Sequence, residues 1–226
     1  MLKKSIGEWF RSEREKLTTM SWRKRLGYLW TYYRFHALAV ICAVVFVVMM
    51  ISGLVQASRD VLISGVLINT ETSKEGYAYL SDGYWVARGG NRHTRVDLVE
   101  AIFLSYSQEN LDMDSVTRMA SIDTMIGARS LDYMILDESA LSVYGPQGIC
   151  ADLSRILPEE LYAKLADKIV TVHGIDSGED YPAAVDLTDS FLAQRYGLSA
   201  DPSYLVVVAN AVDMEKTAAF LEYLFN

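Results

Sequence analysis

The sequence predicts one α/β domain that follows a single membrane-spanning helix. Three observations lead to this prediction: an uncharged stretch at residues 37–55, a basic segment before it, and an acidic segment after it in which short apolar runs alternate with helical patterns. Such alternation is typical of a sheet covered by helices. We therefore divide the chain into a basic and aromatic segment at 1–36, a transmembrane helix at 37–55 and an α/β domain at 58–226.

The uncharged stretch reads ALAVICAVVFVVMMISGLV. As a helix it extends about 28 Å, against a hydrocarbon core of roughly 30 Å. Within lipid, a helix satisfies its own backbone hydrogen bonds. A buried core helix is the alternative, but unbroken apolar runs of this length are unusual in soluble domains. The sequence therefore predicts one membrane span.

The charge distribution predicts which side each part occupies. Residues 1–36 carry nine Lys or Arg and three Asp or Glu, a net charge of +6, which leaves twelve basic and 26 acidic residues, a net charge of −14, in the rest of the chain. Cytoplasmic flanks of membrane helices are rich in Lys and Arg, so we expect a cytoplasmic amino terminus and an extracellular carboxy terminus. The acidic domain argues against nucleic acid as a partner.

The segment before the span suits a membrane surface. Trp22, Leu26, Leu29, Trp30 and Tyr33 share one helical face, and the arginines and lysine at 23–25 supply charge beside it. Aromatic rings and basic side chains both favour the lipid headgroup region, so the lipid bilayer is an expected partner. A short amphipathic helix is also expected within residues 1–20.

Two processing alternatives concern the span. Residues 55–57, VQA, resemble a signal-peptidase site, so cleavage after Ala57 is one alternative; however, the apolar stretch is longer than the core of a signal peptide, which favours an uncleaved anchor. Cys42 lies within the span and follows the bulky Ile41, which argues against lipoprotein processing.

Cys150 has no partner for a disulfide within the domain, and we predict that it is a buried apolar residue.

The domain shows the following pattern. Strands are expected at 61–70, 131–136, 170–172, 183–187 and 204–209, and helices at 96–106, 121–130, 137–145, 158–169, 188–196 and 213–225. The run LVVVA is typical of a strand buried on both faces, so we predict a mixed, largely parallel sheet. Residues 72–95 contain alternating tyrosines, Asp82-Gly83 and Gly89-Gly90, which predict a hairpin with a loop.

That loop contains the candidate ligand-binding residues. It gathers Arg88, Arg92 and Arg95 with Tyr84 and Trp85 in an otherwise acidic domain. Arginine donates paired hydrogen bonds to carboxylates and phosphates, and aromatic faces stack on sugars, so a small anionic or sugar ligand is expected. The alternative is an exposed turn whose arginines neutralise neighbouring acidic helices.

The sequence predicts no catalytic residues, no metal site and no cofactor. His93, His173 and Cys150 are too widely spaced for a known metal motif. Gly89-Gly90 lacks the Lys-Ser/Thr of a phosphate loop, and no serine lies in a nucleophile elbow. Asp132 and Asp137 flank a predicted strand, which indicates solvation of the strand end and helix capping rather than acid–base chemistry.

The stretch SIDTMIGARSLDYMILDESALSVYGPQGICADLSRILP, with Gly127, Gly148 and Asp152-Leu153, resembles bacterial extracellular solute-binding proteins, as do YPAAVDLTDSFLAQRYG and SYLVVVANAVDMEKTAAFLEYLF. Together these segments cover about half of the domain. The resemblance implies a reduced solute-binding lobe beside a transporter. The chain departs from the family because it is shorter than two lobes and has an expected uncleaved span in place of the usual lipid-modified cysteine. No residue-level ligand motif of the family carries over to it.

From these observations we expect a non-enzymatic, single-pass membrane protein whose extracellular domain binds a ligand or a partner such as a membrane transporter. A small surface hydrolase or transferase is the first alternative; a pocket holding carboxylates with perturbed pKa values would favour it. In a second alternative, the membrane span carries the function and the extracellular domain only covers it.

Overall fold

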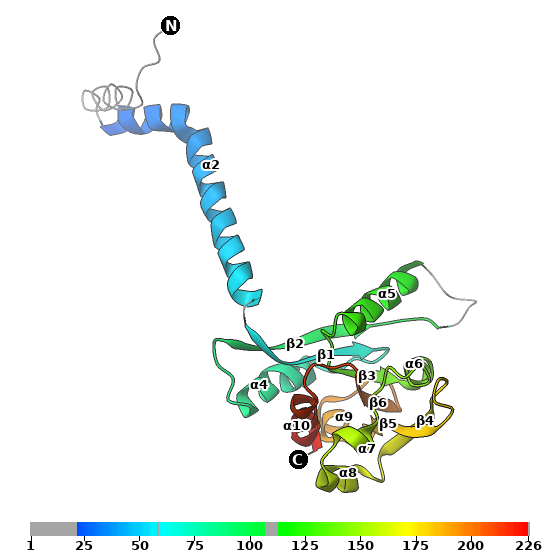
Figure 1. Cartoon of the computed structure of the whole chain (residues 1–226). Helices are drawn as coiled ribbons and strands as arrows, with labels where there is room; N and C mark the ends of the chain where they lie inside the picture. The colour runs from blue at the N-terminus through cyan, green and yellow to red at the C-terminus, as the bar shows by residue number, and fades with distance from the viewer. Residues whose placement is uncertain (1–21, 58, 107–112, 226) are drawn as a thin grey trace. The chain divides into compact units, whose positions relative to one another are not determined.

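The computed structural model describes residues 22–57, 59–106 and 113–225 (Figure 1). The chain divides into two compact units, residues 1–58 and residues 59–226. In the first unit, helix α2 (Trp22–Ala57) includes the whole uncharged stretch, and the side chains of residues 38–54 are exposed. Within the described residues, no helix has the combination of length and apolar character needed to cross a membrane. The amphipathic helix expected within residues 1–20 lies outside the described residues.

The second unit contains a sheet of six described strands. These are β1 (Asp60–Ile68), β2 (Thr94–Ile102), β3 (Tyr133–Asp137), β4 (Ile169–His173), β5 (Asp180–Asp186) and β6 (Ser203–Val207). Their order across the sheet is β2-β1-β3-β6-β5-β4. Among these strands β1 pairs in parallel with β2 and β3, whereas β3–β6, β6–β5 and β5–β4 are antiparallel. The sheet is mixed, as predicted. It is not largely parallel, because β6, β5 and β4 each run antiparallel to the strands they pair with.

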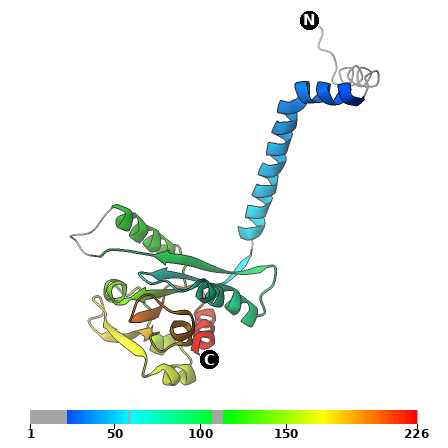
Figure 2. The same ribbon diagram turned by 180° about the vertical axis from the view of Figure 1, so that it is seen from behind.

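Helices cover both faces of the sheet, as Figures 1 and 2 show. One face carries α3 (Lys74–Ala78), η1 (Tyr79–Gly83, one turn of π-helix), α4 (Tyr84–Ala87), α7 (Leu153–Ile156), α8 (Glu159–Leu165), α9 (Phe191–Tyr196) and α10 (Met214–Phe225). The other carries α5 (Met113–Gly127) and α6 (Glu138–Tyr144). The α/β class is therefore confirmed.

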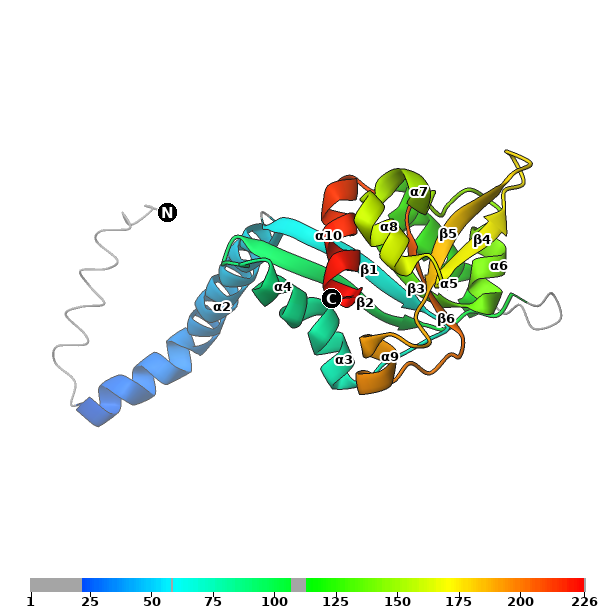
Figure 3. The same cartoon turned by 90° about the horizontal axis from the view of Figure 1, so that it is seen from below.

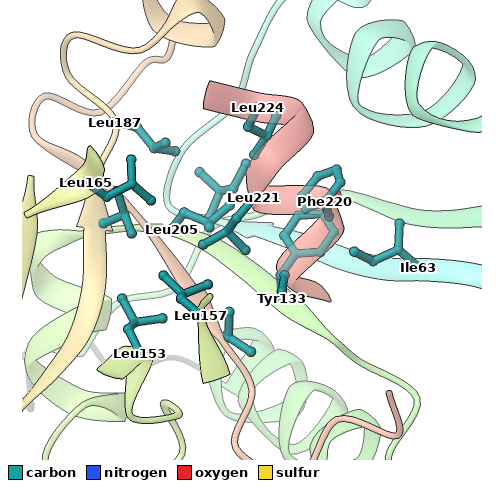
Figure 4. Close-up of a cluster of buried hydrophobic side chains, with 14 of the residues drawn as sticks. Ile63, Tyr133, Leu153, Leu157, Leu165, Leu187, Leu205, Phe220, Leu221 and Leu224 are labelled. Atoms are coloured by element: carbon teal, nitrogen blue, oxygen red, sulfur yellow. The ribbon is translucent and has the colours of Figure 1, made fainter. Parts of the chain in front are cut away.

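Alternate residues of the strands supply the two hydrophobic clusters. In β3, Tyr133 and Ile135 face the cluster beneath α10, while Met134 and Leu136 face the cluster beneath α5. The ring of Tyr133 packs on Phe220 of α10, with centroids 4.3 Å apart (Figure 4). On its other side the ring lies so close to Gly65 of β1 that a Cβ there would be 2.1 Å from Cζ. Gly65, Tyr133 and Phe220 thus form a three-residue stack at the centre of the domain, which we call the central stack.

Residues 74–87 are helical, so the predicted hairpin at 72–95 is wrong. Ser73 caps the segment by accepting a hydrogen bond from Gly76 N at 3.2 Å. The helical spacing of Leu80 and Tyr84 turns both side chains toward the sheet, where they are buried. Gly83 lies inside the helical segment rather than in a turn, where an added Cβ would come within 2.6 Å of the Tyr223 hydroxyl. The alternating tyrosines therefore belong to a helix.

The helix predicted at 96–106 is also wrong, because residues 94–102 form β2. Val96 and Val99 have helical spacing, but Val96 and Leu98 pack together on the α10 side, as alternate strand residues do. Pairing with β1, a contact between segments far apart in sequence, decides the conformation.

The remaining predicted elements are confirmed in type, with shifted ends. Helix α5 begins at Met113, earlier than predicted, and the helix predicted from Thr188 begins after Ser190, which accepts from Ala193 N at 3.1 Å. Asp137 caps α6 by accepting from Ala140 N at 2.9 Å, and Asp213 caps α10 by accepting from Lys216 N at 3.1 Å. Asp132 accepts from Ser64 N and Oγ, so both aspartates that flank β3 have structural roles. Cys150 is buried, as predicted.

Candidate anion-binding pocket

A pocket of about 290 Å³ lies between η1, α4 and the start of β2. Among the described residues that line it, three are arginines, Arg59, Arg92 and Arg95, and one is an aspartate, Asp82. The other lining residues are neutral: Ser81, Trp85, Asn91, Thr94 and Val96. The pocket is therefore cationic, although the domain that carries it has a net charge of −14. We call it the basic pocket.

Trp85 is held in a fixed position beside the arginines. Its Nε1 donates to Thr94 Oγ1 at 3.1 Å and is also 3.2 Å from the Thr94 carbonyl oxygen. Gly90 covers the ring so closely that an added Cβ would lie 2.3–2.4 Å from ring atoms. The segment between α4 and β2 thus needs a residue without a side chain at this position.

The turn that carries Arg92 is also fixed by local hydrogen bonds. The Thr94 hydroxyl accepts from Asn91 N at 2.9 Å, and Asn91 Oδ1 accepts from His93 N at 2.8 Å. Asp60 N donates to the His93 carbonyl at 2.8 Å, which ties the turn to the start of β1. These contacts bring Arg59, which immediately precedes β1, to the arginines of the turn.

The three arginines differ in their surroundings. Arg95 forms an ion pair with Asp97 at 3.0 Å, so part of its charge is balanced. Arg92 is exposed, and its Nε donates to His93 Nε2 at 3.1 Å. Arg59 is half-buried, and its Nε has no hydrogen-bond partner among the described residues. Burying a guanidinium N–H without an acceptor is unfavourable, and an anion would supply that acceptor.

Two of the predicted ligand-binding residues do not line the pocket. Tyr84 is only 1% exposed, and its ring packs edge-on against Phe220 with centroids 5.0 Å apart. Its hydroxyl donates to the Lys216 carbonyl at 3.3 Å, and burial raises its pKa. Arg88 ends α4 on the exposed surface and is not among the lining residues. The prediction for Tyr84 was wrong because the helix turns this side chain inward.

Arg59 was not among the predicted ligand-binding residues. This residue lies far from the arginine-rich stretch in the sequence, and only the pairing of Asp60 with Thr94 across β1 and β2 places it there. A correct prediction of β2 as a parallel neighbour of β1 would have brought the two segments together.

The described residues include no group of three His, Cys, Asp or Glu side chains that could hold a metal ion. Comparisons with protein-family models, curated proteins and solved structures find no match for this chain. The resemblance to solute-binding proteins therefore stays a prediction, and the function has to be argued from the pockets.

Proposed function

We propose that this protein is a non-enzymatic, single-pass membrane protein whose extracellular α/β domain binds a small anion in the basic pocket. The observation that carries the proposal is the convergence of Arg59, Arg92 and Arg95 on one hollow beside Trp85. Guanidinium groups match carboxylate, sulfate and phosphate oxygens in geometry as well as charge. The geometry favours an anion over a neutral sugar, because arginines rather than open aromatic faces dominate the lining.

The acidity of the rest of the domain does not prevent anion binding. At physiological ionic strength the Debye length is about 8 Å, so charges beyond the pocket are largely screened. Ligand selection then depends on the groups that line the pocket. We expect binding to weaken as salt concentration rises, since added ions compete for the same guanidinium groups.

The membrane anchor is proposed on the sequence and on the exposure of α2. Residues 37–55 carry no charge, and large apolar side chains such as Phe46 and Met49 are 67% and 69% exposed. Lipid would cover such a surface without further protein. The basic segment before it supports a cytoplasmic amino terminus, and we propose that the domain lies outside the cell beside a transporter or another membrane protein.

Among the described residues, the alternative of a surface hydrolase or transferase would have to rest on Asp213, which lines a hollow of about 280 Å³ together with Asp132 and Lys216. The carboxyl of Asp213 has a lowered pKa, chiefly because the backbone N–H of Lys216 donates to it. This is the environment of a helix cap rather than of an acid–base pair.

Trp85 provides a direct test of the anion proposal. It is the only tryptophan in residues 59–226, so replacing Trp9, Trp22 and Trp30 with Phe leaves a single reporter beside the pocket. We expect phosphate, sulfate or citrate to change its emission saturably and to raise the unfolding temperature of the full chain, since ligand bound to the native state stabilises it.

The matched variants are the triple R59Q/R92Q/R95Q and the control R88Q. We expect the triple variant to fold but to lose both responses, and R88Q to keep them, because Arg88 lies outside the pocket. Unchanged responses in the triple variant would overturn the proposal. Equal responses to neutral sugars, with or without the arginines, would instead favour a sugar ligand.

A further inference from the structure

Helices α7, α8 and α10 lie near one another on one face of the sheet (Figure 3). A groove with an apolar floor runs along α10 on this face. It consists of two adjoining hollows of about 520 and 560 Å³, which share Arg155, Ile156 and Met214 in their linings. The first extends over Cys150 and Ala151 to the 177–182 segment, and the second lies between α8 and α10. We call the two together the acidic groove.

The floor of the groove is apolar because α10 presents small residues there. Ala218 and Ala219 line it together with Met214, Ile156 and Leu161. An alanine has no side chain beyond Cβ, so the space above α10 stays open to an approaching element. Met214 adds a flexible thioether side chain that adapts to the shape of an occupant.

The rim of the groove is strongly acidic. Its acidic lining residues are Asp152, Glu160, Glu179, Asp180, Glu215 and Glu222, and its basic lining residue is Arg155. Arg155 pairs with Asp152 at 3.0 Å, and Asp180 pairs with His173 at 2.8 Å. Lys164, one turn beyond Glu160 on α8, donates to the Phe225 carbonyl at 2.7 Å. Negative charge therefore remains in excess around the groove.

We infer that the acidic groove binds an amphipathic helix of a partner protein that carries Lys or Arg on both sides of an apolar stripe. An apolar surface with acidic residues around it can recognise such a helix, with apolar anchors against Ala218 and Ala219 and charge pairs at the acidic residues. Nucleic acid and anionic lipid carry the same sign as the rim and are disfavoured. The inference rests on the proposed interaction role of the domain but not on the basic pocket.

A designed peptide tests this inference directly. The probe is a fluorescently labelled 18-residue helix with leucines at helical spacing and lysines flanking them, measured by anisotropy against the full chain in nanodiscs of zwitterionic lipid, with empty nanodiscs subtracted. Two control peptides have glutamate in place of lysine, or the same composition in scrambled order. We expect the lysine helix to bind saturably, with an affinity that falls as salt rises, and both controls to bind at least tenfold more weakly. Equal binding of the glutamate peptide would overturn the inference.

Variants of the chain separate the groove from general acidity. E215K/E222K reverses two rim charges, and the matched control D114K/D123K makes the same charge change on α5, on the opposite face of the sheet. Each pair includes one acidic residue in the first turn of its helix. We expect E215K/E222K to weaken binding at least tenfold and D114K/D123K less than threefold. Equal losses would show attraction to the acidic domain as a whole and would overturn the inference.

A219W tests the floor without any change in charge. The indole fills the space above Ala219, so we expect the peptide to lose at least tenfold in affinity while circular dichroism shows a folded chain. Binding unchanged by A219W would overturn the inference. A dimer in sedimentation that E215K/E222K dissociates would assign the groove to a second copy instead. The phosphate-induced rise in unfolding temperature should persist in every groove variant, so failure here is distinguishable from failure of the anion proposal.

Discussion

The basic pocket and the acidic groove lie on the same side of the sheet but are built in different ways. Most of the pocket comes from one stretch, residues 81–96, with Arg59 added by strand pairing. The groove draws its lining from segments at 148–161, 177–182 and 209–222. When one stretch supplies most of a site, its residues are close together in the sequence and can be recognised there. When the fold assembles a site from distant segments, the sequence shows no such cluster. Phe220 of the central stack belongs to α10, which lines the groove, and packs against Tyr84 of α4, the helix that brings Trp85 to the pocket. Substitutions can therefore disturb the two sites together or separately.

The largest effect is expected from Gly65→Ala, which should disrupt both sites. The added Cβ would lie 2.1 Å from Cζ of Tyr133, a fully buried ring held from the other side by Phe220. Overpacking of this kind costs about 3 kcal/mol. Chemical denaturation of the full chain, followed by Trp85 emission and far-ultraviolet circular dichroism, measures the loss. A free energy of unfolding equal to that of the wild type would show that the ring has room to move.

Gly90→Ala should disturb the basic pocket alone. Its Cβ would meet the Trp85 ring at 2.3–2.4 Å, so the ring has to shift and its hydrogen bonds to Thr94 are strained. We expect a loss of about 2 kcal/mol, a changed Trp85 emission maximum and weaker anion binding, with peptide binding unaffected.

Gly89→Ala is the matched control for that variant. Gly89 has φ +65° with no atom within 4 Å of an added Cβ, so the substitution introduces backbone strain of about 1 kcal/mol and no clash. Trp85 emission should therefore stay close to that of the wild type. If both glycine variants shift the emission equally, the close contact between Gly90 and Trp85 is not what positions the ring.

The smallest effect is expected from Asp213→Ala, which loosens the start of α10 and hence the groove. Losing a helix cap costs about 1 kcal/mol. The folded-state pKa of Asp213 is lowered from 3.8, chiefly by the hydrogen bond from Lys216 N, so its carboxylate stabilises the native state above pH 3.8. This contribution is lost as the pH falls through the lowered folded-state value. The difference in unfolding free energy between wild type and variant, measured from neutral to acidic pH, should shrink in that range; a constant difference would contradict the capping role.

Local chemistry explains why the carboxy-terminal part of the fold could be predicted. Asp137 and Asp213 cap helices that follow directly, and the first three residues of the LVVVA run belong to β6, which lies between two other strands. The predictions failed between residues 71 and 106, where long-range pairing decides. The spacing of Val96 and Val99 fits a helix, and the local sequence does not show that these residues form a strand. Pairing with β1 decides it.

The candidate sites follow the same division. The basic pocket could be predicted in part, since Trp85, Arg92 and Arg95 lie close together in the sequence, while Arg59 could not and Tyr84 was misplaced. The acidic groove was not predicted, because its glutamates look like ordinary solvated positions of α8 and α10 until the helices pack.

The place of β6 has a consequence for how the domain forms during synthesis. Residues 203–207 lie in the middle of the sheet, between β3 and β5, and supply Leu205 and Val207 to one hydrophobic cluster and Val206 to the other. The sheet cannot be completed until β6 has been synthesised, because β6 lies between β3 and β5. Until then one edge of β3 and one edge of β5 have no strand beside them. A nascent chain released before that point would present two open strand edges, a natural target for chaperones and proteases.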